Sequence, residues 1–147
     1  MDLLVGGDLR YHLTKKRVFT EEQTRFFVAC IVHALTFIHR KLIIHRDIKP
    51  ENLVFDQRGF LKITDFSIAK DWNYDISRET SGTPGYMAPE VMCRQNHGVA
   101  VDYYALGVIA YECMMGKVSK GLEIYWLLHF FRGLTLENRG KKSETRS

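Results

Sequence analysis

One stretch of the sequence restricts the possible folds of this chain more than any other. Residues 101–115 are apolar on nearly every face of a helix, through Ala105, Leu106, Val108, Ile109, Ala110, Cys113 and Met114. A helix of this kind is stable in water only when other parts of the protein surround it. With 147 residues, about the length of one domain, the chain is predicted to pack its other elements around this helix.

A second helix and a small hairpin are predicted ahead of the apolar helix. Thr20 followed by Gln23 matches a capping box, and apolar residues then repeat at helical spacing up to Arg40. Three short apolar runs follow, 42–44, 53–55 and 60–63, and the last two are joined by a turn in which Gly59 tolerates positive φ. The expected fold class is α+β, mainly helical, with one small hairpin.

Composition and charge exclude several classes of protein. The 46% hydrophobic content is ordinary for a globular domain, and no apolar run approaches the roughly 20 residues of a membrane span. The last ten residues hold four cations and one acid, which is +3 of the net charge of +4, so no nucleic-acid partner is expected. Three cysteines without C-x-x-C spacing favour neither a disulfide framework nor a zinc site. The opening residues do not match a secretory signal, so the expected location is the cytoplasm.

Polar residues that can carry chemistry gather in three segments between the long helices. Residues 45–52 read His-Arg-Asp-Ile-Lys-Pro-Glu-Asn, and Pro50 is expected to keep this loop from becoming helical. Asp65-Phe66-Ser67 follows at a predicted strand end, and residues 82–90 read Gly-Thr-Pro-Gly-Tyr-Met-Ala-Pro-Glu. Either aspartate alone would be interpreted as a loop carboxylate that caps nearby amides. The three segments in this order favour a shared role.

In this order the segments resemble the catalytic loop, the metal-binding Asp-Phe pair and the Ala-Pro-Glu signature of the eukaryotic protein kinase family. The resemblance covers residues 1–117 and implies a partial kinase domain, the large (C-terminal) lobe from the hinge to the central helix. Residues 118–147 are expected to be a divergent tail, first apolar, then basic and disordered at the end. Residues 5–13 also resemble the hinge and following helix of AGC kinases, closest to YANK-type kinases. The implied reaction is transfer of the ATP γ-phosphate to Ser/Thr hydroxyls of a protein substrate.

The resemblance also implies roles for the matching site residues. Asp47, Lys49 and Asn52 would be catalytic, with Asp47 orienting or accepting the proton of the substrate hydroxyl and Lys49 beside the transferred phosphate. Asn52 and Asp65 offer the hard oxygen ligands that suit Mg²⁺. The implied ATP contacts are Asp2, Leu4, Asp8, Lys49, Glu51 and Val54. Glu51 also resembles the acid that meets a substrate arginine in basophilic kinases, and a solvent-facing role is the alternative.

An activation segment and a set of supporting residues complete the implied site. The expected activation-segment residues are Glu79, Thr80, Ser81 and Thr83. Thr83 resembles the threonine that steadies Asp47 and Lys49. Glu79, four residues before Thr83, stands where AGC relatives often carry a phosphorylated threonine, and it is expected to pair with Arg46, although with less charge than a phosphate. Support is expected from His45, Arg46, Phe66, Glu90 and Asp102, with Asp102 accepting backbone amides of the catalytic loop.

Two departures from the family pattern leave the function open. The sequence has no G-x-G-x-x-G-x-V loop and no V-A-x-K strand, so the small lobe and its phosphate-holding lysine are expected to be missing. Ser67 stands where the family usually has glycine, which is expected to restrict the Asp-Phe pair. The alternatives to an enzyme are a kinase-like binding or regulatory fragment without catalysis and a truncated gene model without independent activity.

Overall fold

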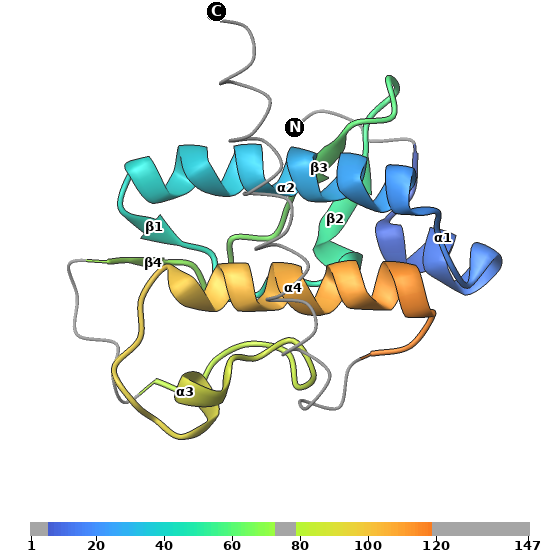
Figure 1. Cartoon of the computed structure of the whole chain (residues 1–147). Helices are drawn as coiled ribbons and strands as arrows, with labels where there is room; N and C mark the ends of the chain where they lie inside the picture. Colours follow the sequence, from blue (N-terminus) through green and yellow to red (C-terminus); the bar gives the residue numbers. More distant parts are fainter. Residues whose placement is uncertain (1–5, 73–78, 119–147) are drawn as a thin grey trace, which may run out of the picture.

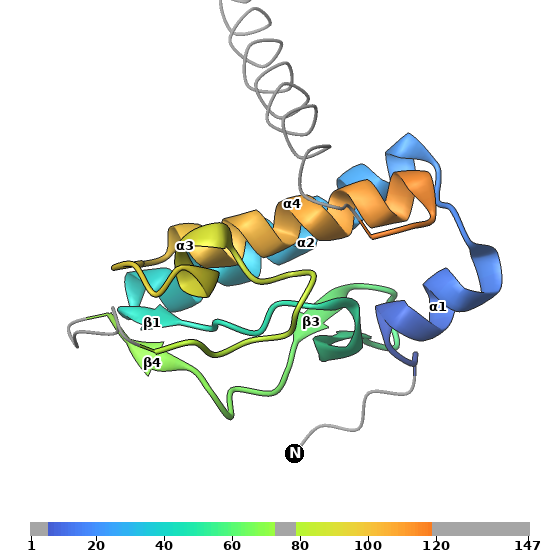
Figure 2. The same cartoon turned by 90° about the horizontal axis from the view of Figure 1, so that it is seen from below.

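Two long antiparallel helices form the frame of the molecule (Figure 1). The computed structural model describes residues 6–72 and 79–118. Its elements in chain order are α1 (Leu9–Lys16), α2 (Glu21–Arg40), β1 (Ile43–Ile44), a 3₁₀ turn (Pro50–Asn52), β2 (Leu53–Phe55), β3 (Leu61–Ile63), β4 (Lys70–Asp71), α3 (Pro89–Met92) and α4 (Ala100–Met115). Figure 2 shows the strands together on one side of the α2–α4 pair, with α1 at one end.

The start of α2 confirms the predicted capping box. Gln23 N donates to Thr20 Oγ1 and Thr20 N donates to Gln23 Oε1, each at 3.2 Å. Because both side chains satisfy amides that the first helical turn leaves without partners, this end of the helix is well defined. The buried side chains of α2 recur every three or four residues and form one stripe against the core: Thr24, Phe27, Ile31, Leu35 and Ile38.

The apolar helix predicted over 101–115 is α4, and it is buried along nearly its whole length. Leu106 and Ile109 pack into the same core as α1 and α2. Gly116 ends the helix in the left-handed conformation, with φ of 70°. Two acids, Asp102 and Glu112, are buried among the apolar residues, so each needs a partner inside the protein.

The predicted hairpin is confirmed as β2 and β3, paired antiparallel in the register Leu53 with Ile63 and Phe55 with Leu61. Gly59 takes φ of 84° in its turn. A second small sheet was not predicted: β1 pairs with β4, which places Ile43 opposite Asp71. The observed architecture of helices with small sheets agrees with the expected α+β class.

The expectation that Pro50 would prevent helical structure in the catalytic loop is wrong for three residues. Pro50 is the first residue of the 3₁₀ turn Pro50–Asn52. Proline is compatible with this position because the first residue of a helical turn does not need its N–H for an internal hydrogen bond. The turn places Asn52 directly before the first residue of β2.

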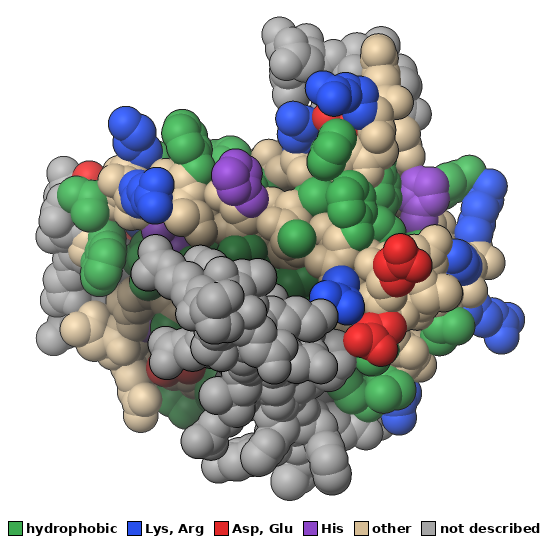
Figure 3. Space-filling view, turned by 45° about the horizontal axis from the view of Figure 1, so that its top comes forward, with side chains coloured by type: hydrophobic (Ala, Val, Ile, Leu, Met, Phe, Trp, Pro, Cys, Tyr) green, Lys and Arg blue, Asp and Glu red, His purple; other side chains and the backbone are tan. Residues whose placement is uncertain are grey.

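Some expectations concern residues that the structure does not describe. Asp2, Leu4 and residues 119–147 of the predicted tail lie outside the described ranges. Within those ranges, no helix has the length and apolar character needed to cross a membrane. Hydrophobic side chains are visible on the surface in the space-filling view (Figure 3). Phe26 and Phe37 of α2 are exposed, and the exposed ring of Phe60 has its centroid 5.6 Å from that of Phe26.

Candidate active site

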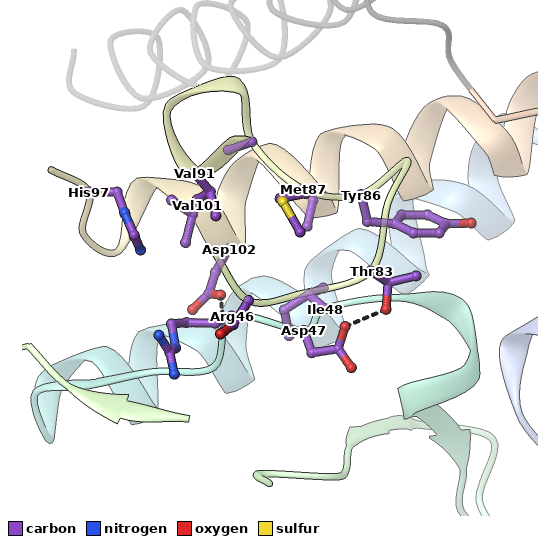
Figure 4. Close-up of a pocket in the computed structure, with 13 residues that line it drawn as sticks. Arg46, Asp47, Ile48, Thr83, Tyr86, Met87, Val91, His97, Val101 and Asp102 are labelled. Atoms are coloured by element: carbon purple, nitrogen blue, oxygen red, sulfur yellow. Dashed lines mark hydrogen bonds between the residues drawn. The ribbon is translucent and has the colours of Figure 1, made fainter. Parts of the chain in front are cut away.

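Asp47, Lys49 and Thr83 form the centre of the site. The Thr83 hydroxyl donates to Asp47 Oδ1 at 2.6 Å, as Figure 4 shows, and Lys49 Nζ lies 2.7 Å from Asp47 Oδ2. Lys49 Nζ also donates to Thr83 Oγ1 at 2.9 Å. An acid and a cation from one loop are thus joined to a hydroxyl that comes from the segment 36 residues later.

The electrostatics of this centre favour an ionised Asp47. Burial acts to raise the pKa of the carboxyl, but hydrogen bonds from Lys49 and Thr83, together with the Lys49 charge, hold it below its usual value. At neutral pH Asp47 therefore offers carboxylate oxygens that accept a hydrogen bond or a proton from a hydroxyl group.

Asn52 joins the centre from the end of the 3₁₀ turn. Its amide Nδ2 donates to the Asp47 backbone oxygen at 2.9 Å and to Asp47 Oδ2 at 3.1 Å. Because the amide nitrogen is committed to Asp47, the amide oxygen is the end of this buried side chain that remains for a cation.

Asp65 lies outside this hydrogen-bonded set. Its carboxylate is exposed and accepts from Ser67 N at 3.2 Å. Hydrogen bonds from Ser67, and then the charge of Lys49, keep the pKa of Asp65 below its usual value. Asp65 takes φ of 62°, a left-handed conformation that is uncommon outside glycine, whereas Ser67 does not have positive φ.

The donors available for a metal ion are therefore one amide oxygen and one ionised carboxylate. In ranges 6–72 and 79–118, no three His, Cys, Asp or Glu side chains gather into a metal cage. Mg²⁺ commonly takes only one or two protein ligands and completes its shell with phosphate oxygens and water. The side chains of Asn52 and Asp65 fit that chemistry.

His45 is fully buried and links the catalytic loop to the strand before Asp65. Asp47 N donates to His45 Nδ1 at 3.3 Å, so the ring hydrogen lies on Nε2, which donates to the Thr64 carbonyl at 3.0 Å. The Phe66 ring packs edge-on against the imidazole with a centroid distance of 4.8 Å. Both ring nitrogens of His45 therefore form hydrogen bonds that hold the imidazole in place.

Asp102, at the start of α4, holds the backbone of the loop of residues 45–52. Its carboxylate accepts from His45 N at 3.0 Å and from Arg46 N at 2.9 Å. The expected contact with loop amides is therefore present. His39, which the sequence did not suggest, adds a third contact from Nε2 at 2.8 Å. These bonds hold Arg46 at φ of 68°, a conformation that costs energy for a side chain with Cβ.

The expected pairing of Glu79 with Arg46 is present. Arg46 Nη1 lies 2.5 Å from Glu79 Oε2, and Arg46 Nε donates to the Ile68 carbonyl at 2.7 Å. Lys70 adds a second cation at 3.1 Å. Hydrogen bonds from Arg46 and then Lys70 lower the pKa of Glu79, so the segment that contains Glu79 meets the loop of residues 45–52 through an ionised acid.

The remaining activation-segment and support residues make fewer contacts. Thr80 is exposed, and Ser81 and Glu90 are partly buried. The charge of Glu90 adds to the effect of burial in raising the pKa of Tyr104.

Apart from Lys49, the described residues expected at the nucleotide make contacts of their own. Asp8 forms a backbone bridge with Val54, and its carboxylate caps α1 by accepting from Tyr11 N at 2.7 Å. Glu51 pairs with Arg10 at 2.8 Å. The expected neighbours Asp2 and Leu4 are outside the described residues.

A charged cluster around Arg10 was not predicted from the sequence. Arg10 contacts Glu51, Glu112 and Tyr86, which are 41, 102 and 76 residues away along the chain. No local pattern relates residues at such separations, so only the folded structure identifies this cluster.

Comparison with known proteins agrees with this geometry. The model of the protein kinase domain family matches residues 1–121. RAC-beta serine/threonine-protein kinase of Homo sapiens is 46% identical over 120 residues, covering 80% of this chain and 25% of that protein. The Mus musculus protein of the same name is 45% identical over the same coverage, and RAC-beta serine/threonine-protein kinase A of Xenopus laevis is 46% identical. The chain thus spans about a quarter of the length of these curated relatives.

Proposed function

This chain belongs to the protein kinase family, in its serine/threonine, AGC-type branch, and from that premise we propose that it transfers the γ-phosphate of ATP to serine or threonine hydroxyls of a protein. One observation carries the proposal: an ionised Asp47, held by Lys49 and Thr83, lies beside the amide of Asn52. This arrangement places a proton acceptor, the Asp47 carboxylate, beside a cation, the Lys49 ammonium.

Phosphoryl transfer needs little covalent chemistry from the protein, because its rate depends on alignment and on stabilisation of charge. In our proposal, Asp47 orients the substrate hydroxyl and accepts its proton. Lys49 lies close enough to Asp47 to oppose negative charge on the group being transferred. Thr83 fixes the carboxylate and the ammonium relative to each other through its hydroxyl.

ATP and Mg²⁺ are the proposed cofactors. Asn52 and Asp65 would hold the ion, which when bound supplies positive charge against the phosphate oxygens. Asp8, Glu51 and Val54, with Asp2 and Leu4 beyond the described residues, remain the proposed nucleotide side of the site. The backbone bridge between Asp8 and Val54 supports two of these assignments by bringing them together.

We further propose that residues 1–117 are the large lobe of the kinase domain and that 118–147 are a divergent tail. Support for the lobe assignment comes from α2 and α4, whose buried residues share one core with Ile48 of the catalytic loop. We propose that Glu79 holds the activation segment against Arg46 and Lys70 without phosphorylation, on the evidence of its two ion pairs.

The proposed activity is tested with the full chain in two measurements: the melting temperature with and without Mg-ATP, and transfer of labelled γ-phosphate to a serine peptide library. A ligand that binds only the folded state raises the melting temperature. We expect Asp47→Asn to keep this rise and to lose about 10²–10⁴-fold in transfer rate, because it removes the proton acceptor. Asp65→Asn is expected to lose both.

The control is Asp56→Asn, which replaces a carboxylate of the hairpin turn away from the proposed centre and is expected to leave nucleotide binding unchanged. A rise in melting temperature without transfer would indicate the non-catalytic binding fragment. The absence of both the rise and the transfer would contradict the proposed function.

A further inference from the structure

The side chain of one arginine contacts residues from three other segments of the chain, next to the catalytic loop. Arg10 of α1 lies 2.8 Å from Glu51 Oε1 through Nε and 2.5 Å from Glu112 Oε1 through Nη1. Its Nη2 donates to the Tyr86 hydroxyl, which in turn donates to Glu112 Oε2 at 2.6 Å. The guanidinium is therefore the cation that both carboxylates share.

The cluster needs a cation to be stable. The Glu112 side chain is only 6% exposed, and a buried carboxylate without a partner is costly. Burial, and then the neighbouring Glu112, raises the pKa of Tyr86, so this phenol stays neutral and donates. Two carboxylates against one guanidinium leave a net charge of −1, and without Arg10 the charge would be −2.

The exposed end of the cluster adjoins the proposed phosphate-acceptor centre. Glu51, whose side chain is 44% exposed, belongs to the same 3₁₀ turn as Asn52 and follows Lys49 by two residues. Tyr86 follows Thr83 by three residues, and its N–H donates to the Thr83 carbonyl at 3.1 Å. Asn52, the residue after Glu51, donates to Asp47, so we expect a protein segment that brings its hydroxyl to Asp47 to pass near Glu51.

We infer that Arg10 determines substrate specificity by occupying, from within the chain, a site that would otherwise bind a basic side chain of the substrate. This inference rests on the proposed function, because it names the class of segment that the site accepts. With Arg10 in place, the two carboxylates already have their cation, and basic residues near the acceptor hydroxyl gain little. The accepted substrates are segments whose recognition does not depend on a basic residue at this point.

The test measures peptide binding by fluorescence anisotropy, with alanine in place of the acceptor serine so that no transfer is required. Two peptide sets are compared, in which a single arginine or its neutral isostere citrulline is moved through the positions around the acceptor. For the unaltered full chain we expect the two sets to bind within about twofold of each other. For Arg10→Gln we expect arginine at one position to bind at least about tenfold more tightly than citrulline.

Two further variants identify the cause of such a gain. Arg10→Gln combined with Glu51→Gln is expected to return the ratio towards one. Lys15→Gln removes a cation from the same helix, where its ammonium contacts the Tyr11 hydroxyl, and should leave the ratio unchanged. If Arg10→Gln fails to fold, Arg10→Gln with Glu112→Gln removes both members of the buried pair and leaves Glu51 free, and arginine peptides should still bind more tightly.

Equal binding of the two peptide sets by the folded Arg10 variant would overturn the inference, as would a tenfold arginine preference in the unaltered chain. Because these measurements need no catalysis, they are separate from the proposed function. A chain that transfers phosphate but shows no Arg10 effect contradicts this inference alone. A chain that shows the Arg10 effect without transfer contradicts the proposed activity alone.

Discussion

Replacing Asp102 by alanine should destabilise this protein more than any loss of a surface acid. Asp102 is 1% exposed and accepts hydrogen bonds from His45 N, Arg46 N and His39 Nε2 at 2.8–3.0 Å. Alanine would leave two buried backbone donors and one imidazole nitrogen without a partner. Each unsatisfied donor costs about 1–3 kcal/mol, so we expect the three together to lower the free energy of unfolding by at least about 3 kcal/mol.

The matched control is Asp56→Ala. Asp56 Oδ1 also accepts two backbone amides, from Arg58 and Phe60, both at 2.9 Å, but these lie in an exposed turn. Water can replace the carboxylate there, so we expect a loss of about 1 kcal/mol or less.

Urea unfolding followed by far-UV circular dichroism measures both variants by linear extrapolation. Small domains have a total stability of about 5–15 kcal/mol, so the Asp102 variant should unfold at far lower urea than the Asp56 variant. Asp102→Asn keeps one acceptor oxygen and should fall between the two. Equal losses for the two alanine variants would refute the argument that burial of the amides makes Asp102 important.

Two further predictions concern the stability of variants, one measured by urea unfolding and the other by melting temperature. Gly6→Ala should lower the free energy of unfolding by about 1–3 kcal/mol, because a Cβ there would lie 2.6 Å from Phe55 Cβ and 2.7 Å from the Phe55 carbonyl oxygen. Gly98→Ala is the control and should cost little, because the nearest atom to its Cβ would be 3.5 Å away. Equal urea midpoints for the two variants would contradict this prediction. The folded pKa of Asp47 lies below its ordinary value of 3.8, so its contribution to stability is present above that pH and is lost as the pH falls through the folded pKa. Melting temperatures measured from pH 5 to pH 3 should therefore fall less steeply for Asp47→Asn than for the unaltered chain, and identical slopes would count against an ionised, paired Asp47.

Elements defined by short-range patterns could be predicted from the sequence. The capping box at Thr20 and the turn at Gly59 each depend on residues within four positions of one another, and both are present in the structure. The burial of α4 follows from its apolar faces alone. The shared centre of Asp47, Lys49 and Asn52 was implied by the resemblance of the segment order to the kinase family.

The family resemblance implied some contacts between distant residues, such as Arg46 with Glu79, but only the tertiary structure decided others. The pairing of β1 with β4 depends on two-residue strands that leave almost no periodic signal. The position of His39 at Asp102 and of Arg10 between Glu51 and Glu112 depends on how α1, α2 and α4 pack. Hydrogen bonds and charge pairs act through space over a few ångströms. A sequence states which groups exist, but the packing of the helices determines which of them come within that distance.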